Sequence, residues 1–466
     1  MFEFQLRDDS KMIRLIPPYQ HEGVHWLLNK ETSRNGPKGG FLCDEMGLGK
    51  TVQLLKTMVD NRKPKTLVVV PKSLISQWIS EVKRFTKFSV ESFEGAKRIL
   101  GTSEICVTSY SLLGDDQLSE VKWDRIILDE AHSIRNSNTK SFKDCMKLAN
   151  SPMCIKWVVT GTPIFNNIKD FVTLSKFVGI TAGNIQRNYD QIRDDYVLRR
   201  TKERLRTSMI PCEFENVELD MSPAEKSLYE VVYEDFCENI RLKAGMMDIL
   251  ESFLRCRQLC VWPQLYYDGV SKKGDFIGER EIWQGSTTKM DYLIQSINEH
   301  PDEKTLVFNQ FTGEALKIKE LLGESANIFV LNGETKNREE VIKGFKESPA
   351  PAVFLIQIKT GGVGLNLQEA SRIYITHPAW NPATELQAIG RAHRTGQTKV
   401  VRIKKLLYTH ENSIETEIVE LQNAKACVSA KILNDPSLQT QIPKVHTVSK
   451  FIFTIGKKMR DSLSLA

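Results

Sequence analysis

DEMGLGKT, residues 44–51, is the stretch that decides the fold of this chain. A glycine-rich turn of this kind joins a strand to a helix and lets backbone N–H groups surround a polyphosphate. We expect Lys50 to reach the β- and γ-phosphates and the Thr51 hydroxyl to bind Mg²⁺. Asp44 stands where the plain pattern has its first glycine, which leaves two glycines in the turn. The residues predicted to contact a nucleotide here are Asp44, Gly47, Gly49, Lys50 and Thr51.

A second acidic motif, DEAH at residues 129–132, follows the apolar run RIILD. Asp129 is placed to hold the Mg²⁺ ion, and Glu130 is placed to orient an attacking water. Either motif alone also fits an ordinary loop or a solvated helix start. Their order along the chain, each after an apolar stretch, favours the functional interpretation. The sequence therefore predicts an ATPase that uses ATP and Mg²⁺, with Lys50, Asp129 and Glu130 as catalytic residues.

Composition places the chain among globular proteins. It is 41% hydrophobic and 26% charged, and its 466 residues are enough for two to four domains. No apolar run approaches the roughly 18 residues that cross a bilayer, and the N-terminus lacks the apolar core of a secretory signal. Cys256 and Cys260 are the closest of nine cysteines, and no second pair completes a zinc spacing. These features predict a reduced, intracellular protein with no membrane partner and no structural zinc.

The charge distribution leaves the question of a nucleic-acid partner open. The formal net charge of +6 at pH 7 is too small to establish one. Residues 441–466 hold five basic residues and one acidic residue, with Phe451 and Phe453 among them. This basic tail either contacts phosphates or packs on the body with its charges solvated.

Short apolar runs recur in two series that are separated by a helical stretch. The first series lies at 66–70, 105–109, 125–129 and 155–160, and the second at 305–309, 327–331, 353–358, 372–376 and 400–403. Continuous apolar strands that alternate with helices are typical of parallel sheets covered on both faces. Residues 222–262 have helix-period apolar positions and a start signal at Ser222-Pro223. The predicted fold class is α/β, with two tandem parallel-sheet lobes and a helical insert between them.

The second lobe contains a pair of arginines. ELQAIGRAHRTGQ, residues 385–397, is predicted to place Arg391 and Arg394 on one helix face at i, i+3 spacing. Arginines supplied by a second domain can neutralise charge on a transferring γ-phosphoryl group, which contributes about 10³–10⁵ in rate. A surface helix with ion pairs is the alternative. Because the chain also has the glycine-rich motif at 44–51 and the acidic motif at 129–132, a catalytic role for both arginines is favoured.

Two further turns follow strand ends. TGTPIFNN (160–167) could couple the Mg²⁺ site to lobe movement through Thr160 and Thr162, and a capping turn is the alternative. KTGGVGLNL (359–367) could approach a phosphate backbone closely, and a tight turn alone is the alternative.

Taken in order, these motifs resemble those of Swi/Snf-type ATPases of helicase superfamily two, with a DEAH box as motif II. The combination of AWNP with Q-A-x-x-R-x-x-R-x-G-Q separates this family from the DEAH RNA helicases. RIILDEAHSIRN and LRCRQLCVWP are most similar to its post-replication-repair and Lodestar-like branch, without the RING finger of many members. The stretches that carry the resemblance are PPYQHEGVHWL (17–27), LCDEMGLGKT (42–51), LVVVPKSLISQW (67–78), ICVTSY (105–110), ILDEAHSIRN (127–136), VVTGTPIFNN (158–167), LRRTK (198–202), KTLVFNQF (304–311), IKTGGVGLNL (358–367), AWNP (379–382) and QAIGRAHRTGQ (387–397).

The resemblance implies two RecA-like lobes. It implies a first ATP-binding lobe at 1–215, a helical protrusion and linker at 216–285, a second helicase C-terminal lobe at 286–440, and the basic tail at 441–466. It also implies an adenine contact at Gln20 and a nucleotide contact at Gly364. The residues that it places on the DNA side are Lys72, Ser73, Thr108, Ser109, Gln310, Gly361, Gly362 and Trp380.

Two departures from the family pattern affect the second lobe. Gln357 and Ile358 stand where the family has small hydroxyl residues that touch DNA phosphate. His377 stands where the family has Asp, so its local hydrogen bond or charge must differ. Trp26 and Trp78 lie at helical apolar spacing, and we assign both to core packing.

The predicted function is an ATP-dependent double-stranded DNA translocase that remodels protein–DNA complexes or DNA structures. The predicted partners are duplex DNA and DNA-bound proteins, inside the cell in the nucleus or another DNA-containing compartment. A strand-separating helicase on DNA or RNA is the first alternative. A non-catalytic DNA-binding scaffold is the second, and the intact ATPase residues argue against it.

Overall fold

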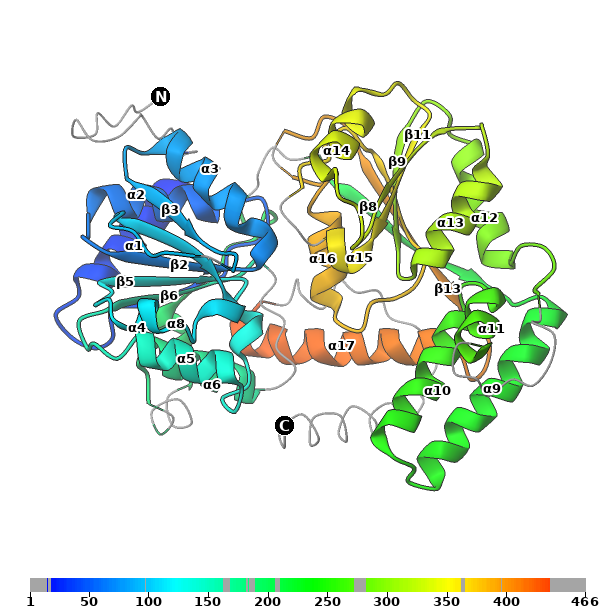
Figure 1. Ribbon diagram of the computed structural model, residues 1–466, viewed down its shortest axis with the longest axis horizontal. Helices are drawn as coiled ribbons and strands as arrows, with labels where there is room; N and C mark the ends of the chain where they lie inside the picture. The colour runs from blue at the N-terminus through cyan, green and yellow to red at the C-terminus, as the bar shows by residue number, and fades with distance from the viewer. Residues whose placement is uncertain are drawn as a thin grey trace. The chain divides into compact units, whose positions relative to one another are not determined.

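The computed structural model describes residues 15, 18–96, 98–161, 168–181, 183, 189–205, 210–271, 282–361, 365–394 and 396–435 (Figure 1). These residues form two compact units. The first contains the described residues of Met1–Ser208 and Cys427–Leu438, and the second contains those of Met209–Ala426. Each unit is an α/β body around its own parallel sheet, so the predicted fold class is confirmed.

The first unit is built on a seven-stranded sheet in the order β3-β4-β2-β5-β6-β1-β7, and every pairing is parallel. Its central strands are buried along their whole length, as continuous apolar runs predict. The runs at 66–70, 105–109 and 125–129 coincide with strands, whereas β1, β3 and β7 were not predicted. The bounds are β1 (Gly39–Leu42), β2 (Thr66–Val70), β3 (Val90–Phe93), β4 (Ile105–Ser109), β5 (Arg125–Asp129), β6 (Ile155–Val159) and β7 (Val197–Leu198).

Helices cover both faces of this sheet (Figure 1). One face carries α1 (Tyr19–Thr32), α2 (Lys50–Asp60) and α3 (Ile75–Phe85). The other face carries α5 (Lys140–Leu148) and α6 (Ile168–Val178). The shorter elements of this unit are η1 (Lys72–Leu74), η2 (Tyr110–Leu112), α4 (Asp116–Ser119), η3 (Ala131–Ile134) and α8 (Tyr189–Tyr196).

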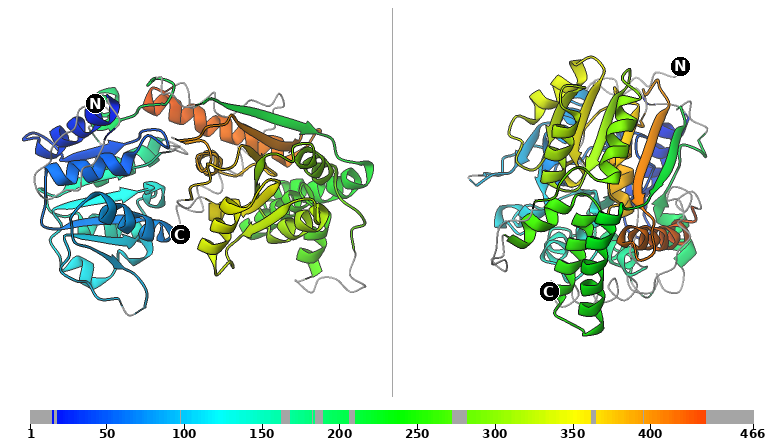
Figure 2. Two further views of the ribbon diagram at one scale, coloured as in Figure 1. Left: turned by 90° about the horizontal axis from the view of Figure 1, so that it is seen from above. Right: turned by 90° about the vertical axis from the view of Figure 1, so that its right-hand side faces the viewer.

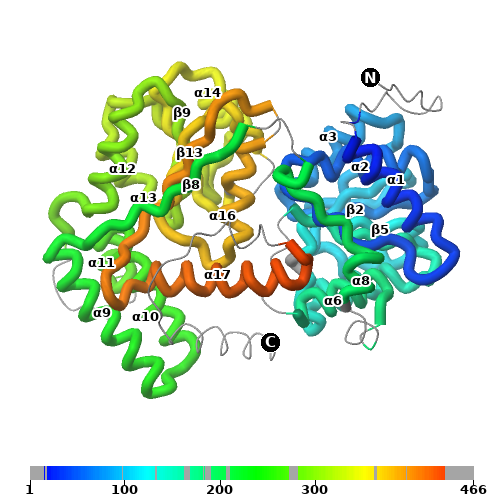
Figure 3. The backbone as a smooth tube through the Cα atoms, turned by 180° about the vertical axis from the view of Figure 1, so that it is seen from behind, coloured from blue at the N-terminus to red at the C-terminus, as the bar shows by residue number. Residues whose placement is uncertain are grey.

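The second unit is built on a six-stranded parallel sheet in the order β10-β11-β9-β12-β13-β8. Its edge is formed by two eight-residue strands that lie side by side (Figures 2 and 3). Because β8 pairs with β13, residues 212–215 belong to the second unit and not to the first lobe, where we predicted them. The bounds are β8 (Cys212–Leu219), β9 (Lys304–Asn309), β10 (Asn327–Leu331), β11 (Ala352–Gln357), β12 (Arg372–Ile375) and β13 (Val401–Tyr408).

Helices also cover this second sheet, and three more form the predicted insert. Ser222 caps α9 through a capping box with Glu225, which is the start signal expected from Ser222-Pro223. α9 and α10 pack side by side (Figure 3). The bounds are α9 (Pro223–Arg241), α10 (Met246–Leu259), α11 (Pro263–Ser271), α12 (Thr288–Asn298), α13 (Thr312–Leu322), α14 (Arg338–Glu347), α15 (Ile358–Gly361), α16 (Pro382–Ile389) and α17 (Ile414–Leu433).

All nine cysteines are free thiols. Within the ranges given above, no group of three or more His, Cys, Asp or Glu side chains is arranged to hold a metal ion. Among the described helices, none combines the length and the apolar composition that crossing a bilayer requires.

A buried polar network surrounds His377, one of the residues that depart from the pattern described above. Its Nδ1 lies 2.6 Å from Glu415 Oε1, and Arg257 Nε donates to its Nε2 at 2.7 Å. Lys289 Nζ pairs with the same Glu415 carboxylate at 2.7 Å. Because Nε2 accepts a hydrogen bond, the imidazole is neutral and its Nδ1–H donates to Glu415. Burial and the charge of Arg257 lower the pKa of His377 to about 4.

We predict that this histidine makes the second unit acid-sensitive. In the unfolded chain this histidine is protonated below about pH 6.5, whereas in the folded protein His377 is protonated only below about pH 4. Stability therefore falls as pH drops from 6.5 towards 4, by up to about 3 kcal/mol. Urea unfolding at pH 7.5 and pH 5 should show a smaller loss for His377→Gln than for the wild type. Equal losses for the two proteins would contradict the assignment.

Candidate functional site

The predicted catalytic residues of the first unit meet at one edge of its sheet. β5, β6 and β1 are adjacent and parallel, so their carboxyl ends point the same way. The glycine-rich loop follows β1, Asp129 ends β5, and Thr160 follows β6. Thr160 N donates to Leu42 O at 3.1 Å, which ties the end of β6 to the start of the loop. In open parallel sheets, ligands bind outside this edge.

The backbone of the loop needs its glycines. Gly47 and Gly49 have φ angles of 89° and 76°, in the left-handed region that glycine adopts without a steric penalty. Lys50 begins α2 directly after this turn, and its Nζ donates to Asp44 O at 3.0 Å. A Cβ at Gly161 would lie 2.7 Å from Lys50 Nζ. Glycine at position 161 therefore lets the segment after β6 approach the loop lysine.

The ammonium group of Lys50 and the nearby carboxylates affect one another's pKa values. Burial lowers the pKa of Lys50, whereas the charges of Glu130, Asp44 and Asp129 oppose that shift. Burial raises the pKa of Asp129 to about 6, and the neighbouring Glu130 charge adds to the shift. The two adjacent, partly buried carboxylates repel each other, and a divalent cation beside them would offset that repulsion. With the Thr51 hydroxyl in the first turn of α2, the oxygen donor set fits Mg²⁺.

Glu130 has an unusual backbone conformation. Its φ angle is 49°, which is left-handed and rare for a non-glycine residue. Its Oε2 accepts from Thr160 Oγ1 at 3.4 Å. Backbone strain of this kind concentrates at functional sites, where it directs a side chain that an ordinary turn would place elsewhere.

Trp78 contacts the site in a way that sequence analysis missed. We assigned it to core packing, and its side chain is indeed buried. Its indole Nε1 also donates to Asp129 Oδ2 at 2.9 Å, which opposes the rise in the Asp129 pKa. Tyr110 OH donates to Asp129 O at 2.7 Å. No sequence signal distinguishes a core tryptophan from one whose N–H reaches a catalytic carboxylate 51 residues away.

Gln20, the expected adenine contact, lies against the loop. It is in the first turn of α1, and its Nε2 donates to Leu48 O at 3.1 Å. A Cβ at Gly49 would lie 2.4 Å from that same Nε2. The structure therefore brings Gln20 and the glycine-rich loop together.

The side chain of Asp44 points into the interior of the first unit. Its side chain is fully buried, and it is held by Arg200, whose Nε donates to Oδ1 at 3.0 Å and whose Nη2 pairs with Oδ2. Gln53 Nε2 donates to Oδ2 at 3.3 Å. The Asp44 carboxylate therefore holds the loop in shape, and a nucleotide contact at Asp44 stays a prediction.

We predicted that the two arginines of the second unit lie on one helix face, and this prediction is wrong. α16 ends at Ile389, and Arg391 and Arg394 follow in a series of tight turns. The Gly390 N–H closes the last helical turn onto Leu386 O at 2.9 Å. Arg391 O accepts from Leu367 N at 2.9 Å, so the arginine turn is joined to the glycine-rich segment after β11.

The residues predicted on the DNA side have unequal access to solvent. Lys72 is exposed in η1, directly after β2, and Ser73 follows it. Thr108 is fully buried and donates to Phe93 O at 2.9 Å, so its hydroxyl is not available to a phosphate. Ser109 is 4% exposed, and its hydroxyl lies 3.0 Å from that of Ser111.

In the second unit, the DNA-side predictions are also mixed. Gln310 is partly exposed after β9, and its carbonyl accepts from Gln357 Nε2 at 3.3 Å. Trp380 stacks edge-on against Phe253 at 5.5 Å and lies beneath Lys425 Nζ. Gly361 ends α15. The predicted residues Gly362 and Gly364, together with Thr162, lie outside the described residues.

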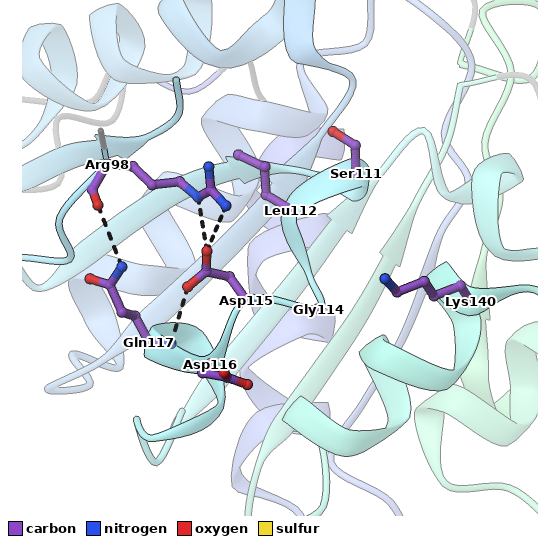
Figure 4. A pocket seen from close by; sticks show the side chains of 8 residues that line it. All are labelled: Arg98, Ser111, Leu112, Gly114, Asp115, Asp116, Gln117 and Lys140. Carbon is purple, nitrogen blue, oxygen red and sulfur yellow. Dashed lines mark hydrogen bonds and ion pairs between the residues drawn. The ribbon is translucent and has the colours of Figure 1, made fainter. Parts of the chain in front are cut away.

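A polar hollow of about 510 Å³ begins near Ser111, beyond the end of β4 (Figure 4). Arg98 and Asp115, which both line it, form an ion pair at 2.7 Å. Lys140 and Asp116 also line it, so its charges balance. None of its lining residues belongs to the predicted nucleotide site.

Comparison with known proteins agrees with these two units. Residues 19–195 match the SNF2-related domain, and residues 288–396 match the helicase conserved C-terminal domain. A probable global transactivator of Orgyia pseudotsugata multicapsid polyhedrosis virus is 29% identical, with 90% of this chain and 92% of the relative covered. The ISWI chromatin-remodeling complex ATPase ISW1 of Saccharomyces cerevisiae is 27% identical, with 91% of this chain and 41% of the relative covered.

A solved structure, the Sulfolobus solfataricus SWI2/SNF2 ATPase core in complex with dsDNA, is 25% identical and has a TM-score of 0.40. The match covers 95% of this chain and 100% of that one. This chain spans most of the viral relative but less than half of the yeast relative. It combines an SNF2-related domain with a helicase C-terminal domain and is a helicase-like ATPase of the SNF2 type.

The Trp78 contact predicts a pH effect. Trp78→Phe removes the N–H that donates to Asp129, and a hydrogen bond to a charged group contributes about 1.5–3 kcal/mol, or roughly one pKa unit or more. The pKa of Asp129 in the metal-free protein should rise above about 6, so protons should compete with Mg²⁺ at a higher pH and ATP turnover should be lost at a higher pH on the acidic side. Turnover measured from pH 5 to 8 at fixed Mg²⁺ should show this shift.

Trp26→Phe is the matched control, because Trp26 packs against Trp157 in the same hydrophobic cluster. For Trp26→Phe, the pH at which ATP turnover is lost on the acidic side should be the same as for the wild type. The same displacement in both variants would show that Trp78 acts through packing alone.

Proposed function

We propose that the chain hydrolyses ATP at the carboxyl edge of the first sheet and uses that energy to translocate along double-stranded DNA. The observation that carries the proposal is the gathering of Lys50, Asp129 and Glu130 at this edge, where they alter one another's ionisation. Partly buried carboxylates beside a loop lysine are costly for stability and are characteristic of a reaction site.

Each residue has a defined role in the proposal. Lys50 balances charge on the β- and γ-phosphates, and its N–H groups turn from Asp44 O to phosphate oxygens. Asp129 and Thr51 would hold Mg²⁺, which supplies charge neutralisation between phosphate oxygens. Glu130 accepts hydrogen bonds from the attacking water and orients it in line with the bond that breaks. Arg391 and Arg394 contribute positive charge to the γ-phosphoryl group.

Duplex DNA is the proposed track, and proteins bound to it are the proposed objects of remodelling. The relatives include an ATPase of a chromatin-remodeling complex, which supports this choice. Exposed Lys72 at the end of β2 provides a phosphate contact without sequence preference. We place the protein in a DNA-containing compartment. Within the family we assign it to the post-replication-repair and Lodestar-like branch, on the stretches RIILDEAHSIRN and LRCRQLCVWP.

Substitutions at the first-unit site test the ATPase proposal. Glu130→Gln keeps the shape of the side chain but removes the base that orients water, so turnover should fall by about 10² or more while ATP still binds. Lys50→Ala should lose both turnover and tight ATP binding. Turnover by phosphate release and affinity by equilibrium binding provide the two measurements. Substantial hydrolysis by purified Glu130→Gln would refute the assigned role.

Two DNA substrates separate translocation from strand separation. A translocase that keeps the duplex closed should displace a third strand from a triplex, whereas a forked duplex should stay paired. The ATP-driven rate should fall with salt, because phosphate contacts release counterions. Glu130→Gln serves as the inactive control on both substrates. Efficient opening of the fork would favour the strand-separating helicase instead.

A further inference from the structure

The segment LRRTK, residues 198–202, runs beside the first residues of the glycine-rich loop. β7 pairs with β1, and the contact continues beyond both strands. Cys43 N donates to Leu198 O at 2.8 Å, and Glu45 N donates to Arg200 O at 2.9 Å. The side chain of Arg200 holds the Asp44 carboxylate, as described above. Three successive loop residues are therefore fixed by a segment about 156 positions away.

Arg199 adds a contact to the loop backbone from the other side of this segment. Its Nη1 donates to Cys43 O at 2.8 Å, and its Nε donates to Asp435 Oδ2 at 2.9 Å. The side chains of Arg199 and Asp435 are 4% and 1% exposed. One buried guanidinium thus connects the loop to a residue near the end of the described chain.

The position of Asp435 is set by the way α17 ends. Asn434 follows the helix with a φ angle of 50°, a left-handed conformation that reverses the chain. Asp435 N then donates to Ala430 O at 3.0 Å, and Arg204 Nη2 donates to Asn434 O at 3.2 Å. The last turn of α17 packs into the hydrophobic core of the first unit. Asp435 is therefore part of a packed helix end.

Because guanidinium and peptide groups are planar, the Arg199–Asp435 ion pair also fixes the orientation of the loop backbone at Cys43. A guanidinium is planar, so a carboxylate that fixes Nε also fixes the direction of Nη1. The peptide between Cys43 and Asp44 is planar too, so holding Cys43 O sets where Asp44 N–H points. The Asp44 carbonyl that follows accepts from Lys50. Without Asp435, the buried charge of Arg199 would have to find another acceptor, because an unpaired buried charge is strongly disfavoured.

We infer that Asp435 is a positioning residue for nucleotide binding, which acts through Arg199 on the Cys43–Asp44 peptide of the glycine-rich loop. Asn434 and Asp435, which follow α17, are then a structural part of the nucleotide site. This inference rests on the proposed ATPase function. Neither Asp435 nor Arg199 touches nucleotide in this account, and both act through the loop backbone.

Two variants of the full-length chain test the inference. Asp435→Asn keeps the shape but removes the charge that orients Arg199. Arg199→Lys keeps a charge for Asp435 but loses the planar fork that reaches Cys43 O at the same time. Both should raise the KM for ATP by about tenfold and change kcat by less than about threefold, because the ground-state fit of the phosphates is what changes. Assays are run well below each variant's unfolding temperature.

Glu31→Gln is the matched control. Glu31 forms another buried ion pair of the first unit, with Arg125 at 2.5 Å, and neither residue contacts the glycine-rich loop in the hydrogen bonds described. It should lower the unfolding temperature while its KM stays at the wild-type value. An Asp435→Asn KM within twofold of wild type, or an equal rise in Glu31→Gln, would overturn the inference.

Binding of a fluorescent ADP analogue gives a readout that does not depend on turnover. Asp435→Asn and Arg199→Lys should bind it about tenfold more weakly than the wild type and Glu31→Gln. If the wild type binds the analogue but hydrolyses no ATP, the proposed function fails and this affinity comparison still decides the role of Asp435. If the wild type binds no nucleotide, both are overturned.

Discussion

The parallel direction of all seven strands in the first sheet is the constraint on which the rest of the site depends. Parallel strands need a crossover after each strand, so every loop that leaves a carboxyl end emerges at the same edge. The loops after β1, β5 and β6 are neighbours there because those strands are neighbours in the sheet. A glycine-rich loop, two carboxylates and a threonine that are far apart in sequence are thereby brought together at one edge of the sheet.

A layer of buried polar contacts then holds these loops in shape. Trp78 fixes Asp129 from the side of α3, and Arg200 fixes Asp44 from the segment after β7. Trp78 is buried and Arg200 is largely buried, so losing its acceptor would leave either donor unsatisfied in a low-dielectric environment. The cost of such a loss makes the arrangement specific, since an alternative loop conformation would break several of these bonds at once.

Much of this architecture could be predicted from local sequence, and the missing parts depend on contacts between distant residues. Apolar runs located most strands, because full burial requires an uninterrupted apolar sequence. The short β1 has two glycines in four residues, so it lacked that pattern. The role of Asp44 in holding the loop could not be predicted, because its partner Arg200 lies 156 residues away in the sequence. Arg391 and Arg394 were predicted on a helix that ends before them, at Ile389.

The central claim is that duplex DNA controls an ATPase motor, and ATP turnover in the presence of different nucleic acids tests it most directly. The wild-type protein would be assayed alone, with duplex DNA, with single-stranded DNA and with duplex RNA, at low salt where phosphate contacts are strongest. We expect strong stimulation by duplex DNA and weak stimulation by the other two nucleic acids. Stimulation mainly by single strands or by RNA would contradict the account.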